Sequence, residues 1–405
     1  MASITVKETK QRIKMVDALR GFALLGIVLF HNLEHFNFYS ETPFNPEWAK
    51  ALDGYVWDFL ALVFSGKAYG IFSILFGFSF WVQYSNQKTR GNHFAGRFAW
   101  RMVLLFCFGV FHSLFYNGDI LGMYALLGFV LILTRKWSNK AVLILAFICI
   151  LQPIDWIKLL IAFQDPNWKM AHPSWALSGE LYDARVHGSY LTMVWKNFTY
   201  GQLSNFCWIW NYGRLCQATG LFLLGMTLAR KQMFSDVKPA FWIKALIVSI
   251  PASYILDWFK GYMLTNVITG GHAELAEIIL NLYICVPETL ILLSLLILAW
   301  HYFSYFQKAL GWLAPYGRTS LTNYITQSII GTYICFGYGL GLYQYCGATL
   351  SAMVGIVIVI FQILISHWWL HRYKQGPFEW LWKQATWIGS NRKPKTLVTP
   401  EEERD

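Results

Sequence analysis

Charged side chains are scarce in this chain of 405 residues. Asp, Glu, Lys and Arg together make up 14% of it, whereas soluble domains contain about 25% charged residues. This shortage excludes an ordinary water-soluble enzyme fold, and the high apolar content excludes an intrinsically disordered chain. Apolar residues reach 56% and aromatic residues 18%. So many Trp and Tyr are typical of a protein that crosses two membrane–water interfaces.

Motifs for disulfides, metals and nucleic acids are also missing. The seven Cys form no C-x-x-C pair, and no group of Cys and His has the spacing of a zinc site. We therefore expect the cysteines to act as small apolar residues and predict no metal, haem or flavin site. The net charge of +11 is dispersed over separate segments, so it indicates membrane topology rather than a nucleic-acid partner.

What the chain does contain is a series of long apolar segments. A helix of about 20 apolar residues crosses the hydrocarbon layer, and ten segments fit: 17–33, 64–82, 98–116, 119–134, 141–162, 208–229, 240–259, 278–300, 319–340 and 349–370. Lys and Arg gather before the first segment and after the second, fourth, sixth, eighth and tenth. Cytoplasmic loops are rich in these residues. We therefore predict an all-α, polytopic membrane protein of about ten helices with both termini in the cytoplasm.

Residues 1–395, spans and loops together, are expected to form one transmembrane domain. No small-residue cleavage site follows the first span, which predicts that this span is retained. The outer loop 163–207 is polar but rich in Trp, so it either covers an outward-facing cavity or lies on the membrane surface. Segment 374–388 combines Trp with Lys, which is typical of an amphipathic helix at the cytoplasmic interface. Residues 396–405 are predicted to be disordered.

Two spans carry a cation and an imidazole at matching positions. Arg20 and His31 are eleven residues apart, which places them on one helix face about 16 Å apart along the axis. Arg101 and His112 repeat the spacing. Asp119 opens the next span at the level of His112, where it either caps the helix or holds an imidazole in one tautomer. Ionisable groups inside spans usually mark functional sites, although interfacial arginines and histidines satisfied by helix neighbours would produce the same pattern.

A second set of polar side chains is predicted to line a cavity between the spans. Its members are Lys67, Arg214, Asn281, Glu288, Asn323 and Gln327. Glu288 is expected near the bilayer centre, where a carboxylate is a functional candidate by default. Three structural alternatives stay open: Lys67 extending to the interface, an ion pair between Glu288 and Arg214, and helix-to-helix hydrogen bonds by the amides.

Five blocks of sequence resemble the YeiB-like family of bacterial membrane proteins. They are Asp17–Gly26 (DALRGFALLG), Phe72–Gly77 (FSILFG), Gly118–Leu121 (GDIL), Gly317–Tyr324 (GRTSLTNY) and Gly376–Trp382 (GPFEWLW). Because the blocks run from the first span to the C-terminal segment, the resemblance covers nearly the whole chain. That family is related to a wider superfamily of transmembrane acyltransferases. Its members share a bundle of about ten helices and often carry Arg or Lys, ten residues and then His in the first span, as Arg20 and His31 do.

The resemblance implies transfer of an acetyl- or succinyl-type group from cytoplasmic acyl-CoA, a co-substrate, to a hydroxyl of an extracytoplasmic sugar or glycolipid. It also implies the bacterial cytoplasmic membrane. Such a reaction needs a base for the acceptor proton. We predict His31 in this role, with His112 second and Asp119 as the group that orients an imidazole. The anionic donor is expected to bind cations at the inner mouth, and the predicted topology places four there: Arg20, Arg97, Arg101 and Arg318.

A transporter is the alternative, because Glu288 and the neighbouring amides would also suit a substrate path. Against it, the sequence shows no pair of interrupted helices in corresponding halves of the chain and no inverted repeat. A membrane protein that only binds partners has no positive sequence support. The oligomeric state is left open.

Overall fold

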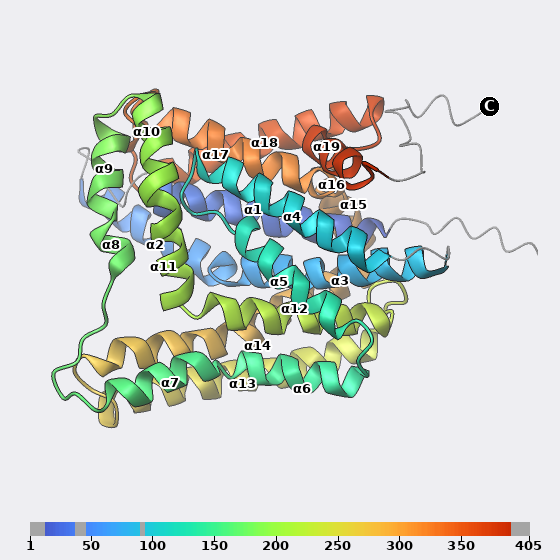
Figure 1. The fold of residues 1–405 in the computed structure, drawn as a ribbon, viewed down its shortest axis with the longest axis horizontal. Helices are drawn as coiled ribbons and strands as arrows, with labels where there is room; N and C mark the ends of the chain where they lie inside the picture. Colours follow the sequence, from blue (N-terminus) through green and yellow to red (C-terminus); the bar gives the residue numbers. More distant parts are fainter. Residues whose placement is uncertain (1–12, 37–45, 90–93, 390–405) are drawn as a thin grey trace, which may run out of the picture.

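The computed structural model describes residues 13–36, 46–89 and 94–389. Over these residues the protein is a bundle of helices without a β-strand (Figure 1), which confirms the all-α prediction. Seven helical segments in the described ranges are long and apolar enough to cross a membrane: Lys14–Glu34, Glu47–Thr89, Phe94–Ser113, Asn139–Ala162, Pro239–Asn266, His272–Tyr302 and Ala348–Arg372. The predicted tail 396–405 lies outside the described residues.

The long helices of the bundle follow most of the predicted spans. They are α1 (Lys14–His31), α3 (Lys67–Thr89), α4 (Phe94–Ser113), α13 (Pro239–Asn266), α14 (His272–Tyr302) and α18 (Ala348–Arg372). Three predicted spans correspond to shorter helices: α5 (Leu121–Thr134), α12 (Arg214–Arg230) and α17 (Ser320–Cys335). The total of ten membrane crossings therefore stays a prediction.

A helix precedes the second predicted span. The sequence predicted no span between 17–33 and 64–82, but Glu47–Phe64 forms helix α2. Gly66, with φ of +68°, makes the turn into α3. A Cβ added at Gly26, in the second half of α1, would lie 2.3 Å from the Phe64 ring and 3.0 Å from Ala68. The turn between α2 and α3 is therefore inside the bundle, and Lys67 lies deeper than the outer end of a span.

Two further helices are interrupted where the sequence predicted continuous spans. Segment 141–162 divides into α6 (Asn139–Ile150) and α7 (Pro153–Ala162), because Pro153 cannot continue the hydrogen bonding of a helix. Gly213, with φ of +61°, separates α11 (Gln202–Asn211) from α12. A Cβ at Gly213 would lie 3.2 Å from Oε1 of Gln152, so the two breaks meet. The prediction of two continuous spans at 141–162 and 208–229 was wrong.

The two ends of the bundle carry different short helices. One end holds α8 (Pro173–Ala176), α9 (Ser178–Val186) and α10 (Tyr190–Lys196) from the predicted outer loop (Figure 1). The other end holds α15 (Ser304–Gly311), α16 (Ala314–Arg318) and α19 (Pro377–Thr386). The described part of α1 begins at this second end, where α19 also lies (Figure 1). We call it the basic end, because the predicted Lys- and Arg-rich loops belong to it.

Glycines allow the central helices to touch backbone to backbone. A Cβ added at Gly77 of α3 would lie 1.9 Å from the Phe222 carbonyl oxygen of α12, and one at Gly225 would lie 1.9 Å from the Ile74 carbonyl oxygen of α3. Gly317 approaches the Asp17 carbonyl oxygen of α1 in the same way. The last contact brings α1 and α16 together at the basic end, next to Arg20 and Arg318.

Candidate functional site

A cavity of about 510 Å³ opens at the basic end of the bundle. Helices α1, α3, α4, α5 and α17 contribute to its wall, together with α19 and the segment before it. Five cationic side chains line it: Arg20, Arg101, Arg318, Lys374 and Lys383. Glu379 is the single carboxylate in this lining. The cavity is thus strongly cationic and suits an anionic group.

The cavity cations are held by neighbouring side chains and backbone. Arg20 donates to Oδ1 of Asp17 at 2.9 Å and to the Ser79 hydroxyl at 2.8 Å. The Arg101 guanidinium lies 4.0 Å from the Trp382 ring centroid, and its Nε is buried without a hydrogen-bond partner in the described structure. A buried donor without a partner carries a desolvation cost, which a bound anion at this position would offset.

Helix α19 closes one side of the cavity by way of Glu379. Its carboxylate accepts hydrogen bonds from the backbone N–H groups of Leu321 and Thr322, at 2.7 and 3.1 Å. These groups belong to the first turn of α17, where N–H groups lack helical partners. Burial raises the pKa of the Glu379 carboxyl above its usual value. Both oxygens of Glu379 are thus engaged by the start of α17, including the Thr322 hydroxyl.

Aromatic and apolar side chains form the deeper wall of the cavity. They are Phe72, Phe76, Phe80, Phe98, Met102, Leu105, Leu121, Tyr124 and Tyr324. Tyr324 is the last residue of α17 in this lining. Its ring centroid lies 4.7 Å from that of His112 and 6.3 Å from that of His31. The cavity therefore ends at the Tyr324 ring, which packs against His112 and His31, and neither imidazole belongs to the cavity lining.

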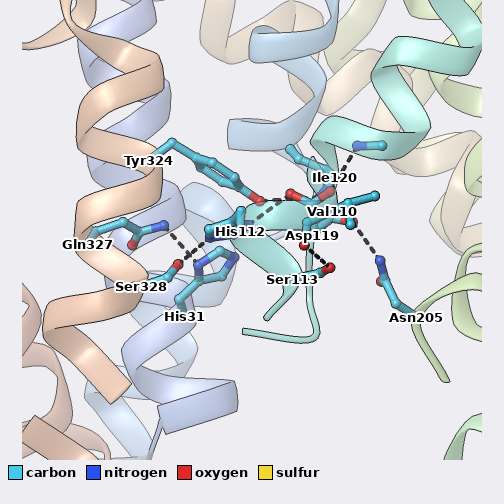
Figure 2. Close-up of polar contacts among 11 residues, drawn as sticks. His31, Val110, His112, Ser113, Asp119, Ile120, Asn205, Tyr324, Gln327 and Ser328 are labelled. Carbon is cyan, nitrogen blue, oxygen red and sulfur yellow. Dashed lines mark hydrogen bonds and ion pairs between the residues drawn. The ribbon is translucent and has the colours of Figure 1, made fainter. Parts of the chain in front are cut away.

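Around His112, three polar side chains are joined in series (Figure 2). Nδ1 of His112 lies 2.8 Å from Oδ1 of Asp119, and Nε2 lies 2.8 Å from the Ser328 hydroxyl. His112 and Ser328 are completely buried and Asp119 is 4% exposed. The second oxygen of Asp119 accepts the N–H of Gly122 at 2.8 Å. Asp119 therefore both caps α5 and orients an imidazole, so the two roles left open by the sequence coincide.

His31 stands beside this series at the end of α1. Nε2 of Gln327 lies 3.1 Å from Nδ1 of His31 (Figure 2). The Tyr116 ring centroid lies 4.9 Å from that of His31 and 5.8 Å from that of His112. A π-helical turn, Asn32–Phe36, follows directly, and such turns are frequent at functional sites. Both predicted imidazoles thus meet in one cluster, supported by Gln327 of the predicted cavity set.

The other predicted site residues lie elsewhere. Arg97 donates to the carbonyl oxygens of Thr386 and Ile388 at the end of α19, outside the cavity lining. Asn281 is exposed on α14 and accepts from Lys260, so its prediction as a cavity residue was wrong. Asn323 donates to Ser366 of α18 at 2.9 Å, which matches the helix-to-helix alternative.

Lys67, Glu288 and Arg214 form a separate interior group. Nζ of Lys67 lies 2.9 Å from Oε2 of Glu288. The ion pair of Glu288 is thus with Lys67, whereas Arg214 donates to Gln217 at 3.0 Å. Lys67 is 7% exposed, so it does not extend to the interface. None of the three belongs to the lining of the cationic cavity.

Sequence reasoning missed several residues of the site. Ser328, Tyr324, Trp382, Lys374 and Lys383 were not selected. Ser328 follows Gln327 directly and lies one helical turn beyond Tyr324, so helical spacing alone would have added it to the polar face of α17. No such signal links α19 to the cavity, because that contact joins segments far apart in the chain. Within the described ranges, no three His, Cys, Asp or Glu side chains are grouped so that they could hold a metal ion.

The long helices expose apolar faces, and the interior of the bundle holds cations and imidazoles. These two features define a polytopic membrane protein. Comparison with known proteins narrows this class. Residues 228–389 match the family described as "Protein of unknown function (DUF418)". The chain is 31% identical to the "Uncharacterized protein YxaH" of Bacillus subtilis, with 96% of this chain and 97% of the relative aligned.

Two other bacterial relatives align over similar lengths. The "Uncharacterized protein YeiB" of Escherichia coli is 28% identical, over 92% of this chain and 95% of the relative. An "Uncharacterized 39.9 kDa protein in amylase 3'region" of Bacillus acidopullulyticus is 27% identical, over 96% and 97%. The protein belongs to this DUF418 family, which confirms the resemblance to YeiB-like proteins read from the five sequence blocks.

Proposed function

We propose that this protein is a membrane-embedded acyltransferase of the bacterial cytoplasmic membrane. It moves an acetyl- or succinyl-type group from acyl-CoA, bound at the basic end, to a hydroxyl of a sugar or glycolipid that arrives from the other end. With the basic end in the cytoplasm, both termini are inside. The single observation that carries the proposal is that Tyr324 lines the cationic cavity and also packs against the imidazoles of His112 and His31.

The cavity fits the two parts of an acyl-CoA molecule. Phosphate groups need cations and donors, which Arg101 and the other four cationic side chains provide at the mouth. The pantetheine arm and its acyl group are less polar, and they suit the aromatic wall that leads to Tyr324. The cations at the mouth are needed because a phosphate that is buried without a partner has a large desolvation cost.

The imidazole cluster supplies the proton transfer that acyl transfer needs. A carboxylate only accepts hydrogen bonds, so Asp119 keeps the proton of His112 on Nδ1 and leaves Nε2 as the acceptor. This favours His112 as a general base. His31, the base expected from the sequence, contacts the same Tyr116 and Tyr324 rings, so it is positioned to act on the second substrate.

The proposal is tested by measuring CoA release from acetyl-CoA by the purified protein in detergent, with and without a mixture of sugar acceptors. His112→Ala is expected to lower the rate by about 10²–10⁴-fold, the usual contribution of a general base. His31→Ala is also expected to lower the rate of CoA release. His301→Ala, which changes an exposed imidazole at the end of α14, serves as the matched control. Wild-type protein that binds no acyl-CoA and releases no CoA would refute the proposal.

A transporter remains the second candidate because of two observations. The pair of Lys67 and Glu288 places opposite charges inside the bundle, and the breaks at Gln152 and Gly213 meet as interrupted helices do in many transporters. Proton-coupled solute uptake in vesicles that is lost in Glu288→Gln, together with the absence of CoA release, would support this candidate instead.

A further inference from the structure

Ser328, His112 and Asp119 are arranged as a nucleophile, a base and an orienting carboxylate. The two contacts, Oγ to Nε2 and Nδ1 to Oδ1, are each 2.8 Å (Figure 2). This is the geometry that activates a serine hydroxyl on several unrelated folds. The three residues come from α17, α4 and the segment before α5, so the arrangement depends on the packing of the bundle and not on a local motif.

Each member of the series is fixed by further contacts. Asp119 accepts from the N–H of Gly122 at 2.8 Å, and its backbone carbonyl accepts from Nδ2 of Asn205 at 2.7 Å. His112 packs against the Tyr324 ring at 4.7 Å between centroids. With its carboxylate held by Gly122 and its backbone by Asn205, Asp119 keeps the imidazole in the tautomer whose Nε2 faces the Ser328 hydroxyl. The base is therefore already positioned to take the serine proton.

The position of Ser328 connects this series with the cavity. Along α17, Leu321 and Tyr324 line the cavity, and Ser328 follows on the same face one turn later. Tyr324 is 1% exposed, and its hydroxyl accepts the N–H of Ile120 at 3.3 Å. A group in the cavity would therefore reach the Ser328 hydroxyl after the Tyr324 side chain has moved aside.

A buried atom beside Ser328 also points to a ligand. Oε1 of Gln327 is buried and has no hydrogen-bond partner in the described structure, while Nε2 of the same side chain contacts His31. Buried polar atoms in a purely structural network are normally satisfied. An acceptor hydroxyl that donates to Oε1 of Gln327 would satisfy this atom.

We propose that Ser328 is an acyl-accepting nucleophile, so that transfer proceeds through an ester on its hydroxyl. This inference rests on the proposed acyltransferase function. Oγ of Ser328 attacks the thioester carbonyl carbon while Nε2 of His112 takes its proton. The C–S bond then breaks, and the leaving thiolate takes that proton and departs as the thiol. Next, the acceptor hydroxyl attacks the ester, its proton passes to His112, and the C–O bond to Ser328 breaks as Oγ regains a proton.

The step is tested by incubating the full-length protein in detergent with acetyl-CoA labelled in the acetyl group and no acceptor. After acid quenching, label is expected on the peptide that carries Ser328, with CoA released in the same amount. Ser328→Ala is expected to remove the label, and Asp119→Asn to slow its formation roughly 10³–10⁴-fold. Ser328→Cys is expected to hold the label as a thioester that hydroxylamine removes. The matched control is Ser294→Ala, because Ser294 is a fully buried serine on α14 away from the series.

The outcomes of these experiments separate the inference from the function on which it rests. Acyl transfer that continues in Ser328→Ala at the wild-type rate, without label on the protein, overturns the nucleophile and leaves the acyltransferase standing. If wild-type protein releases no CoA, the proposed function fails, and a fluorophosphonate probe then decides about Ser328. If the probe modifies Ser328 in wild-type protein but not in His112→Ala, Ser328 is an activated serine that serves another acyl donor. If the probe does not modify Ser328 in wild-type protein, the role of Ser328 as a nucleophile is overturned.

Discussion

At the scale of single residues, Tyr324 joins the two halves of the candidate site. Its side chain belongs to the cavity lining and its ring contacts both imidazoles. A larger or smaller side chain here would change how far a donor reaches without removing any proposed reacting group. The site is therefore organised around one aromatic residue that the sequence pattern did not distinguish from the other 72 aromatic side chains of the chain (20 Trp, 22 Tyr and 31 Phe in total).

Arg101 provides a test of the donor site at the same scale. Arg101→Gln is expected to weaken acyl-CoA binding about 10–100-fold, because a hydrogen bond to a charged group contributes about 1.5–3 kcal/mol. The measurement is equilibrium binding in detergent. Arg372→Gln, at an exposed arginine near the end of α18, is the control and should leave the affinity within a factor of two. Equal affinities of the Arg101 variant and wild type would contradict an anion site at the cavity mouth.

At the scale of elements, close contacts between helices hold the walls of the cavity. The approach of α3 and α12 through Gly77 and Gly225 leaves no room for a Cβ, and α19 covers the cavity through Glu379 and Trp382. The sequence predicted an amphipathic segment at 374–388, and α19 forms within it. What it did not indicate is that this helix contacts α4 and α17, since an amphipathic pattern only says that one face is buried.

Gly77 tests this packing. Gly77→Ala places a Cβ 1.9 Å from the Phe222 carbonyl oxygen, and overpacking of this kind costs about 1–3 kcal/mol. We expect the purified Gly77→Ala protein to unfold at a lower temperature than wild type. Unfolding is measured by fluorescence-detected size-exclusion chromatography after heating. Gly54→Ala is the control, because a Cβ there has no atom within 4 Å. An unchanged melting temperature for Gly77→Ala would mean that α3 and α12 do not approach as closely as described.

The interrupted helices show where element prediction fails. Segments 141–162 and 208–229 have the apolar content of continuous spans, yet they break at Gln152 and Gly213. Hydropathy reports only whether a segment prefers lipid or protein to water. It carries no information about a single residue at positive φ, although Pro153 and Gly213 were visible local signals of a break.

At the scale of the whole molecule, the two ends of the bundle have different chemistry. The basic end contains the cationic cavity, α16 and α19, and the opposite end contains α8, α9 and α10 (Figure 1). The distribution of Lys and Arg over alternate loops predicts that the basic end is cytoplasmic. Donor and acceptor would then enter from opposite sides of the membrane, and the imidazole cluster would lie between them.

This orientation is tested by labelling single cysteines in intact bacterial cells with a thiol reagent that does not cross the membrane. In a background without the native cysteines, Lys383→Cys is expected to stay unlabelled until the cells are opened. His187→Cys, directly after α9 at the opposite end, is expected to react in intact cells. Labelling of the Lys383 position from outside would reverse the topology and would separate the cavity from cytoplasmic acyl-CoA.

The sequence by itself determined the all-α membrane class and the alternation of basic loops, because a bilayer requires long apolar helices and charge controls which loops stay inside. It also selected His31, His112 and Asp119, since ionisable groups are costly inside a membrane. Only the tertiary structure decided that Ser328 meets His112, that Glu288 pairs with Lys67, and that Asn281 faces outward. These outcomes depend on which helices are neighbours and how each is rotated, and both follow from the packing of the whole bundle.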